Sequence, residues 1–245
     1  MINFFEDNTM NYNNLDFNNK TILITGGAGF IGSNLAFYFQ KNFSNSRIVI
    51  FDCFRSDSVF SNGNLQSFGH YKNLIGFKGE IICGNIANLN NLSLLSKYKF
   101  DYIFHQAAIS DTRVYDQTLI METNINSFYN LLNIAKKDNA AMIYASSAAT
   151  YGSMPSPQTE GHESPENPYG FSKLTMDQIA SKYSRENPKM IVVGLRYFNV
   201  YGPREYFKAK TASMVIQLGH QILSGKAPRL FKGSDNILRD FIYID

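Results

Sequence analysis

Short apolar runs alternate with stretches of helical spacing along most of this chain. The runs are rich in β-branched residues and cover residues 20–25, 47–52, 79–83, 101–105, 140–146 and 190–197. The stretches between them place apolar residues at helical spacing and cover residues 30–39, 89–98, 114–135 and 169–183. Near-continuously apolar strands that alternate with helices are typical of a parallel sheet with helices on both faces. The sequence therefore predicts an α/β fold with a doubly wound parallel sheet, joined by right-handed crossovers.

The expected domain boundaries follow from where the alternation of apolar runs and helical stretches begins and ends. Residues 1–19 hold seven asparagines and show no periodicity, so we expect a flexible N-terminal tail. Residues 20–198 would form the sheet domain, and residues 199–239 the start of a smaller, here incomplete, substrate-binding domain. Residues 240–245 would return to the sheet domain, and because they stop inside an apolar element we expect the natural chain to be longer. The polar, proline-rich segment 151–168 is interpreted as a lid or active-site loop.

The composition is that of a globular protein. Of 245 residues, 44% are hydrophobic and 18% are charged. No apolar run approaches the roughly 20 residues that a membrane-spanning helix needs, and no signal peptide is recognisable, so we expect a cytoplasmic protein without a membrane partner. The net charge of +3 does not indicate a nucleic-acid partner, although residues 196–239 hold eight basic and two acidic residues. That segment is either an anion site, for instance for a diphosphate, or an ordinary solvated face.

The cysteines and histidines do not indicate a metal site. Cys53 and Cys83 are too few for a disulfide framework or a thiolate zinc site, and we expect each to be a small buried residue. His105 follows an apolar run and is interpreted as structural. The remaining histidines lack the spacing of metal ligands; they are His70, His162 and His220.

A glycine-rich turn follows the first apolar run. Gly27, Gly29 and Gly32 satisfy the pattern G-x-G-x-x-G, and Gly26, Gly29 and Gly32 satisfy G-x-x-G-x-x-G. Glycine is needed there because the backbone must turn tightly and approach a pyrophosphate without a Cβ atom in the way. The helix that follows offers unpaired N–H groups and the positive end of its dipole to the phosphates. We therefore expect this turn to bind a dinucleotide.

The residues after the second and third runs form the expected adenosine site. Asp52, 20 residues beyond Gly32, is placed to accept a hydrogen bond from a ribose hydroxyl. Asn85 and Ile86 could bond to the adenine and pack against it. Asp52 favours NAD, whereas Arg55 could pair with the 2′-phosphate of NADP or be an ordinary surface residue. These residues leave the choice of coenzyme open.

A tyrosine and a lysine lie four residues apart on the last predicted helix. Tyr169 and Lys173 share one helical face, after Asn167 as N-cap and Pro168 in the first turn. The lysine cation, the helix N-terminus and an oxidised nicotinamide would all favour the phenolate form of Tyr169. An exposed pair on the helix surface is the alternative. Ser147, at the end of the fifth run, favours the catalytic interpretation because ligands bind at the carboxyl edge of such sheets.

Six motifs follow one another over residues 21–245. They are Thr25-Gly-Gly-Ala-Gly-Phe-Ile-Gly32, His105-Gln-Ala-Ala108, Glu122-Thr-Asn-Ile-Asn126, Tyr144-Ala-Ser-Ser-Ala-Ala-Thr-Tyr-Gly152, Tyr169-Gly-Phe-Ser-Lys173 and Arg196-Tyr-Phe-Asn-Val-Tyr-Gly-Pro-Arg204. In these motifs the sequence resembles the short-chain dehydrogenase/reductase superfamily, specifically its extended branch of sugar-nucleotide epimerases and dehydratases. Within that branch it looks most like the epimerases that act at C6 of ADP-glycero-manno-heptose, a precursor of the lipopolysaccharide core. The resemblance implies transient oxidation and re-reduction of the sugar with bound NADP, with NAD as the alternative.

The resemblance also implies roles for single residues. Ser147 would bond to the reacting oxygen, Tyr169 and Lys208 would transfer protons, and Lys173 would hold the nicotinamide ribose. The implied cofactor-binding residues are Gly26, Gly29, Phe30, Ile31, Gly32, Asp52, Arg55, Asn85, Ile86, Gln106, Ala107, Ala108, Ser110, Asn124, Tyr169, Lys173 and Val200. The implied substrate-binding residues are Ser147, Asn199, Lys210, Gln217, Phe231, Lys232, Gly233, Ser234 and Arg239. Departures from the family pattern occur at Cys53 and in the longer stretch 54–79, and these leave NADP preference open.

Epimerisation itself demands a second acid–base group. The oxygen of the carbonyl intermediate must occupy two positions, and useful proton transfer needs heavy atoms within about 2.6 to 3.2 Å. Lys208 is the candidate for the second position, and we expect its basic surroundings to lower its pKa through like charge. Lys210 is the rival, and attraction of the diphosphate by both lysines is the alternative.

Two other functions remain open at this stage. A UDP-sugar 4-epimerase or a nucleotide-sugar dehydratase is the first, although Ala148 and Ala149 stand where a dehydratase of this branch needs an acidic pair. A cofactor-binding regulator is the second, but such proteins usually break the Ser/Tyr/Lys set that this chain retains. A homo-oligomer could form through the helices predicted at 114–135 and 169–183.

Overall fold

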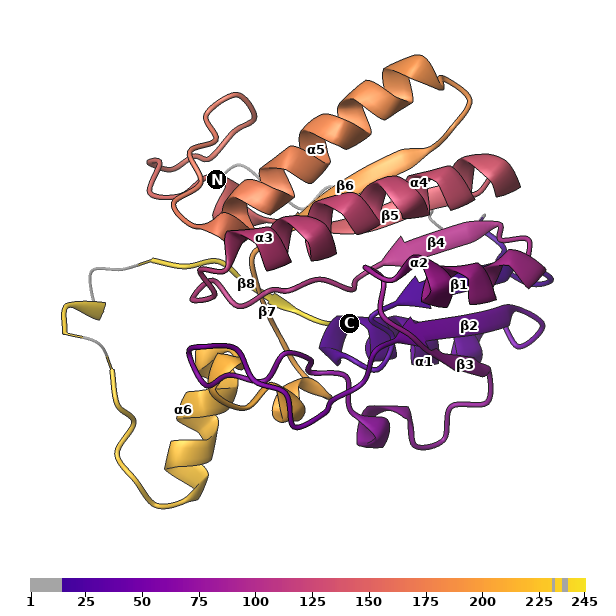
Figure 1. The fold of residues 1–245 in the computed structure, drawn as a ribbon. Helices are drawn as coiled ribbons and strands as arrows, with labels where there is room; N and C mark the ends of the chain where they lie inside the picture. The colour runs from indigo at the N-terminus through magenta and orange to yellow at the C-terminus, as the bar shows by residue number, and fades with distance from the viewer. Residues whose placement is uncertain (1–14, 231, 235–237) are drawn as a thin grey trace, which may run out of the picture.

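A six-stranded parallel sheet forms the centre of the molecule (Figure 1). The computed structural model describes residues 15–230, 232–234 and 238–245. The strands are β1 (Thr21–Thr25), β2 (Arg47–Asp52), β3 (Glu80–Cys83), β4 (Tyr102–His105), β5 (Ala141–Ser147) and β6 (Val192–Tyr197). Their order is β3-β2-β1-β4-β5-β6, in which the direction of winding reverses between β1 and β4. The predicted doubly wound α/β fold is confirmed, and ligands bind at the carboxyl edge beside such a reversal.

Helices cover both faces of the sheet. They are α1 (Phe30–Asn42), α2 (Leu89–Leu92), α3 (Gln117–Ile120), α4 (Ser127–Asp138) and α5 (Pro168–Glu186). Short 3₁₀ segments are η2 (Tyr71–Leu74), η3 (Ser93–Lys97) and η5 (Ala148–Thr150), and the π-helical η4 (Met121–Asn126) joins α3 to α4. The helix predicted at 89–98 is therefore broken into two short pieces, and the one predicted from residue 114 begins at Gln117.

Successive residues of β1 supply two separate cores. Leu23 is fully buried in a core with residues of α4 and α5, including Phe128 and Met176. Ile22 and Ile24 are fully buried in the other core, with Ala36 of α1. Alternate side chains of a strand point to opposite faces, so this apolar strand needs a helical layer on each side.

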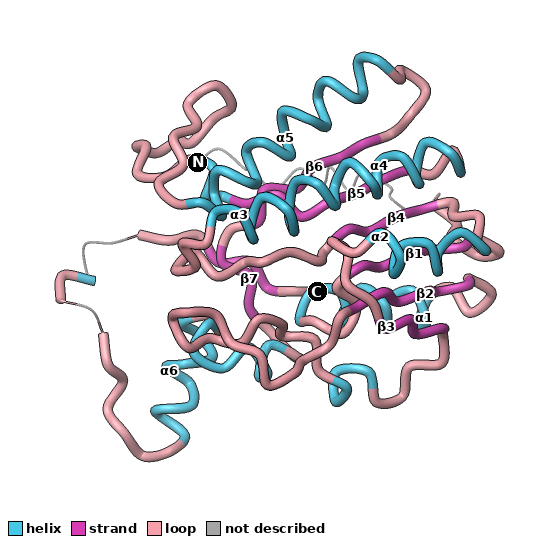
Figure 2. Tube along the Cα trace, in the orientation of Figure 1, coloured by secondary structure: helices cyan, strands magenta, loops and turns pink. Residues whose placement is uncertain are grey.

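The chain after the six-stranded sheet forms a few further short elements. It comprises β7 (Asn199–Tyr201), η6 (Glu205–Thr211), α6 (Met214–Leu223) and β8 (Phe241–Tyr243). β8 pairs in parallel with β7, so residues 241–243 belong to a two-stranded sheet and not to the six-stranded one. Residues 224–230 are exposed, and Figure 2 shows them as a loop after α6 that leads away from the rest of the molecule.

Two sequence predictions outside the site need correction. Phe17 packs against Phe39, Phe43 and Tyr102, so the folded part of the chain begins before Lys20. Both cysteines are exposed, contrary to the expected burial. Cys83 is the last residue of the edge strand β3, and Cys53 follows β2, where the strand leaves the covered part of the sheet. Residues 1–14 lie outside the described residues.

The turn between β1 and α1 depends on glycine at position 32. A Cβ atom on Gly32 would lie 2.3 Å from the carbonyl oxygen of Gly26, which is backbone and cannot move aside. Gly32→Ala should therefore destabilise the fold by about 2 kcal/mol and lower Tm by roughly 4–8 °C in a thermal melt. Gly219→Ala is the matched control, because a Cβ atom there would meet nothing within 4 Å and alanine favours the helix α6. An unchanged Tm for Gly32→Ala would mean that the turn can relax.

Candidate functional site

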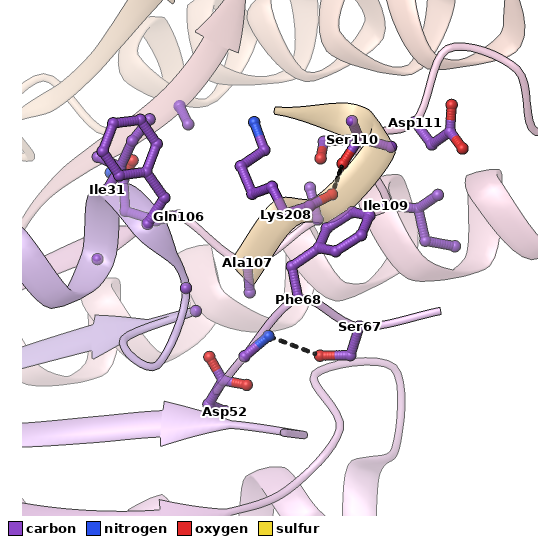
Figure 3. Close-up of a pocket in the computed structure, with 18 of the residues that line it drawn as sticks. Ile31, Asp52, Ser67, Phe68, Gln106, Ala107, Ile109, Ser110, Asp111 and Lys208 are labelled. Atoms are coloured by element: carbon purple, nitrogen blue, oxygen red, sulfur yellow. Dashed lines mark hydrogen bonds between the residues drawn. The ribbon is translucent and has the colours of Figure 1, made fainter. Parts of the chain in front are cut away.

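A cavity of about 670 Å³ opens at the carboxyl edge of the six-stranded sheet. Its walls come from the turn after β1, the ends of β2, β4, β5 and β6, the start of α5, and η6. Figure 3 shows Asp52, Phe68, Gln106 and Lys208 among the side chains that line it. This volume and position are typical of a site for a small molecule or cofactor.

The glycine turn forms one wall as predicted. Gly26, Gly29, Phe30, Ile31 and Gly32 all line the cavity. Gly29 is the N-cap of α1, so the first N–H groups of that helix lie at the cavity wall. Gly26 has a φ of +70°, and a Cβ atom there would lie 2.7 Å from the backbone nitrogen of Ala107. The turn thus has the geometry that a pyrophosphate requires.

Asp52, at the end of β2, lines the cavity and bonds to the glycine turn. Its Oδ2 accepts a hydrogen bond from the backbone N–H of Ala28 (2.9 Å), and its Oδ1 accepts one from Phe54 (2.8 Å). Burial raises the pKa of Asp52, although those N–H groups oppose the rise. Asn85 and Ile86 line the cavity nearby, as expected for an adenosine site.

A wall that the sequence did not predict comes from the loop after β2. This loop covers residues 54–70 and is called the 54–70 segment below. Its residues Phe60, Gln66 and Phe68 line the cavity. Asp111, after β4, holds this segment by accepting hydrogen bonds from the side chains of Asn62 (3.2 Å) and Asn64. Arg113 also pairs with Asp111, at 3.1 Å. The unusual length of the stretch 54–79 was the only signal for this wall in the sequence.

Ser147, Tyr169 and Lys173 meet at the opposite wall of the cavity. Asn167 caps α5 by accepting a hydrogen bond from the N–H of Gly170 (2.9 Å), and Pro168 opens the helix, as predicted. The Nζ of Lys173 donates to the carbonyl oxygen of Ala145 (2.7 Å) and lies 5.9 Å from the centre of the Tyr169 ring. Both members of the predicted helical pair therefore face the cavity, with Lys173 buried and Tyr169 half-buried.

Burial governs the protonation of this pair. It lowers the pKa of Lys173 to about 8, and the negative charge of Asp177 partly opposes that change. It also raises the pKa of Tyr169, while a hydrogen bond with Ser147 acts to lower it. In the protein without coenzyme, the cost of burying a phenolate is the largest effect on the pKa of Tyr169, and a phenolate favoured by Lys173, the helix terminus and an oxidised nicotinamide stays a prediction.

Lys208 reaches the same cavity from η6. Its Nζ lies 5.9 Å from the centre of the Phe30 ring. Burial lowers the pKa of Lys208, and Glu205 opposes this. The lowered pKa was expected, but its cause is desolvation and not the like charge of neighbouring basic residues. Lys210 is exposed and does not line the cavity.

Several further predicted residues lie where the sequence placed them. They are Gln106, Ala107, Ala108, Ser110, Asn199 and Val200, all of which line the cavity. The side-chain amide nitrogen and oxygen of Gln106 are both buried and have no hydrogen-bond partner among the described residues. These two polar atoms, together with the glycine turn and the N-terminus of α1, fit a dinucleotide with its polar carboxamide and phosphate groups.

Other predicted residues are not brought to the cavity. Asn124 is fully buried and holds the loop after β4, through the N–H and carbonyl groups of Ile109, and also donates to Ser172. Arg55 lies between lining residues, but its Nη2 donates to the carbonyl oxygen of Phe207. The expected substrate residues after η6 lie outside the lining because α6 and the loop after it lead away from the sheet; they are Gln217, Lys232, Gly233, Ser234 and Arg239. Phe231 lies outside the described residues.

The segment predicted to be a lid is instead tied to the sheet. Arg196, on β6, pairs with Glu163 at 2.7 Å and with Asp177 at 2.9 Å. Asp177 also accepts hydrogen bonds from Tyr144 (2.8 Å) and Ser146 (3.0 Å). Residues 151–168 do not line the cavity, so a lid role finds no support in the geometry.

His105 is a structural residue, as predicted. It is buried beneath the site, with its Nδ1 2.7 Å from the hydroxyl of Thr25. Burial, with a smaller effect of Lys173, lowers the pKa of His105 to about 3, so the ring is neutral.

Metal-binding clusters and membrane-spanning helices are both absent from the described residues. Within residues 15–230, 232–234 and 238–245, His, Cys, Asp and Glu do not gather in groups of three or more that could hold a metal ion. In that same part of the chain, no helix has both the length and the apolar character that crossing a bilayer requires.

The chain is similar to known proteins over nearly its whole length. The model of the "NAD dependent epimerase/dehydratase family" matches residues 22–245. The ADP-L-glycero-D-manno-heptose-6-epimerase of Brachyspira hyodysenteriae is 40% identical over 229 residues, which are 91% of this chain and 68% of that protein. The crystal structure of the Helicobacter pylori ADP-L-glycero-D-manno-heptose-6-epimerase matches with a TM-score of 0.85 and 53% identity, over 93% of this chain and 70% of that one.

A structure solved with coenzyme is also similar. The Thermus thermophilus UDP-glucose 4-epimerase in complex with NAD matches with a TM-score of 0.75 and 25% identity, over 91% of this chain and 70% of that chain. The family model, the heptose epimerases and the cavity with its glycine turn and Ser147, Tyr169 and Lys173 agree with one another. The chain therefore belongs to the NAD dependent epimerase/dehydratase family of enzymes.

Proposed function

We propose that the protein epimerises ADP-glycero-manno-heptose at C6 and so supplies heptose for the lipopolysaccharide core. One observation carries the proposal: Ser147, Tyr169 and Lys173 line the same cavity as Lys208, beside a complete glycine turn. The identities of 40% and 53% to two heptose epimerases support this choice of substrate. A UDP-sugar 4-epimerase is the second candidate, because the cavity's acid–base residues would serve that reaction as well.

The first half of the proposed reaction removes hydrogen from the carbinol carbon. A nicotinamide coenzyme, when bound, supplies reversible acceptance and return of a hydride. Ser147 would donate a hydrogen bond to the sugar oxygen, and Tyr169 would take the proton from its hydroxyl group. For this Tyr169 must ionise, and its raised pKa makes an additional positive charge beside it necessary. Lys173, whose pKa of about 8 leaves it mostly cationic at neutral pH, supplies part of that charge.

The second half returns hydrogen to the opposite face of the carbonyl carbon. The carbonyl group must turn within the cavity, so its oxygen moves away from Tyr169. Lys208 would then donate the proton that completes the new hydroxyl group. Burial lowers the pKa of Lys208, which makes its ammonium group a better proton donor than an exposed lysine.

For the coenzyme we propose NADP, with NAD as the alternative. The family is NAD dependent, and Asp52 is placed for a ribose hydroxyl. Arg55 supports NADP, because it lies between the lining residues Phe54 and Ser56 and its buried Nε has no hydrogen-bond partner among the described residues. A 2′-phosphate could take that donor.

Location and assembly are also proposals. We propose a cytoplasmic enzyme that takes a small nucleotide-sugar substrate and forms a homo-oligomer through the helices at 114–135 and 169–183. Size-exclusion chromatography with light scattering would measure the assembly.

The stereochemistry of the product tests the reaction directly. The purified protein is incubated separately with the two C6 epimers of ADP-glycero-manno-heptose and with UDP-glucose, and products are identified by NMR. Interconversion of the two heptose epimers is the expected result. Turnover of UDP-glucose alone would favour the 4-epimerase.

Tyr169→Phe should abolish turnover and leave coenzyme affinity nearly unchanged. The substitution removes the ionisable oxygen and keeps the ring that lines the cavity. Loss of an acid–base group costs about 10²- to 10⁴-fold in rate, measured as kcat. Tyr183→Phe, at the other end of α5 and outside the cavity lining, is the control. Normal turnover by Tyr169→Phe would remove the assigned proton acceptor.

Lys208→Met should separate the two halves of the reaction. Epimerisation should fall by at least about a hundredfold, while reduction of an aldehyde analogue from one face survives with Tyr169 as the donor. Both rates can be followed by coenzyme absorbance and product analysis. If Lys208→Met raises KM and keeps kcat, Lys208 is an anion contact; if Lys210→Met loses the turnover instead, the roles are exchanged.

Arg55→Ala should discriminate between the coenzymes. If Arg55 contacts the 2′-phosphate, the affinity for NADP(H) should weaken by about 1.5 to 3 kcal/mol in a calorimetric titration, with NAD(H) nearly unchanged. Equal losses for both coenzymes would show that Arg55 does not recognise the phosphate.

A further inference from the structure

The 54–70 segment and η6 meet outside the cavity, at the residue that precedes Lys208. The Nη2 of Arg55 donates a hydrogen bond to the carbonyl oxygen of Phe207. The ring of His70 stacks on the ring of Phe207, with centroids 3.9 Å apart and planes inclined by 7°. The backbone and the side chain of Phe207 are thus held by two different residues of one segment.

The same segment is fastened to the glycine turn. The backbone N–H of His70 donates to the carbonyl oxygen of Ala28 (2.9 Å), and the N–H of Arg55 donates to Gly69 (2.7 Å). Asn73 adds a side-chain hydrogen bond to Ala28 (3.1 Å). A continuous set of contacts therefore runs from the turn after β1 to Phe207.

The backbone around Lys208 needs such external support. Ala209 has a φ of +50° and a ψ of −123°, which interrupts the 3₁₀ conformation of η6 directly after Lys208. Non-glycine residues in this region cost of order 1–3 kcal/mol and persist only where neighbours hold them. Glu205 holds the start of η6 by accepting hydrogen bonds from Ser213, and Phe207 is held as described. The direction of the Lys208 side chain depends on both.

His70 is suited to this contact as a neutral ring. Burial, together with the positive charges of Arg55 and Lys72, lowers the pKa of His70. Its Nδ1 accepts a hydrogen bond from the N–H of Lys72 (3.1 Å), which requires that nitrogen to be unprotonated. A neutral ring beside Arg55 avoids the repulsion that an imidazolium would cause.

We propose that Arg55 and His70 act through Phe207 to position Lys208, so that the 54–70 segment couples the adenosine end of the cavity to the second proton donor. This inference rests on the proposed epimerisation, in which Lys208 is that donor. Arg55 and His70 are positioning residues for Lys208, because they act on it through Phe207. The contact with a 2′-phosphate proposed above would use the Nε of Arg55, whereas this role uses its Nη2.

The pH dependence of the reactivity of Lys208 tests the proposal without substrate or coenzyme. The full chain is acylated briefly with an amine-specific reagent between pH 6 and 11, and labelling of Lys208 is measured by peptide mass spectrometry. The midpoint reports the pKa of Lys208, which burial lowers. The titratable and charged groups that share the cavity with Lys208 are Asp52, Cys53, Asp111, Tyr169, Lys173, Tyr197 and Glu205. None of them changes in the variants below.

Arg55→Met removes the donor to Phe207 and keeps a long side chain. Released from its position, Lys208 becomes more hydrated, so its labelling midpoint should rise by about half a pH unit or more. Arg55→Lys retains a donor and should restore part of the difference. Arg47→Met is the matched control, because Arg47 is an exposed arginine on β2 that pairs with Glu80 on the edge strand β3.

Phe207→Leu provides a second, independent variant. It removes the ring stacked on His70 and leaves the backbone carbonyl bonded to Arg55, so a smaller shift in the same direction is expected. Thermal melts check that each variant folds. Labelling midpoints equal to that of the unchanged protein in both Arg55→Met and Phe207→Leu would overturn the proposal.

A turnover measurement separates this inference from the proposed function. Arg55→Met should lower kcat for epimerisation about tenfold or more, but cause no further loss when Lys208 is already methionine. If the losses of kcat from Arg55→Met and Lys208→Met add up in the double variant, the positioning role of Arg55 is overturned and the proposed epimerisation is not. Full epimerisation by Lys208→Met would overturn the role of Lys208 as proton donor, while the labelling result would still decide whether Arg55 positions it.

Discussion

The close approach of α1 to the end of β1 determines where everything else in the site can lie. Gly32 lies so near the Gly26 carbonyl that no side chain fits between them. This packing brings the N-terminus of α1 to the cavity wall and turns the Ala28 N–H toward Asp52 and the Ala28 carbonyl toward His70. Hydrogen bonds at Ala28 thus orient both the Asp52 carboxylate and the 54–70 segment. A side chain at position 32 would therefore shift the N-terminus of α1, the Asp52 carboxylate and the 54–70 segment.

Desolvation, more than pairwise charge, determines the chemistry of the cavity. The pKa of Lys173 and that of Lys208 fall, and that of Tyr169 rises, with burial as the largest cause in each. The sequence reveals which charges are neighbours along the chain, but not how deeply each is buried. This is why the direction predicted for the pKa of Lys208 was right and its cause wrong.

Local patterns predicted most of the fold and one side of the site. The apolar runs located all six strands of the sheet, because strands buried on both faces leave a continuous signal. The glycine turn and the pair Tyr169 and Lys173 were found because their chemistry depends on short, fixed spacings. Contacts between distant segments have no such signature. Asp111 with Asn62 and Asn64, or Arg55 with Phe207, became visible only in the structure.

Asn124 and Arg55 both make structural contacts that the sequence did not reveal. Both were expected at the coenzyme, and in the structure the side chain of each bonds to backbone groups of a neighbouring loop. Their polar side chains satisfy buried N–H and carbonyl groups that no regular element pairs, and leaving such groups unpaired costs about 1–3 kcal/mol each. Holding a loop beside the site is therefore a structural role for these two side chains that does not depend on contact with a ligand.

The two proposed proton-transfer groups, Tyr169 and Lys208, come from different elements of the fold. Ser147 and Tyr169 are fixed by β5 and α5, within the six-stranded sheet and its helices. Lys208 belongs to η6, beyond the sheet, where the backbone departs from regular structure. In the proposed reaction, Tyr169 and Lys208 can reach opposite faces of the substrate only if the distance between α5 and η6 is maintained. Contacts from the sheet to η6 therefore matter as much as the groups themselves, and Arg204 provides another of them by donating to Asn34 of α1 and to the backbone of Asn73.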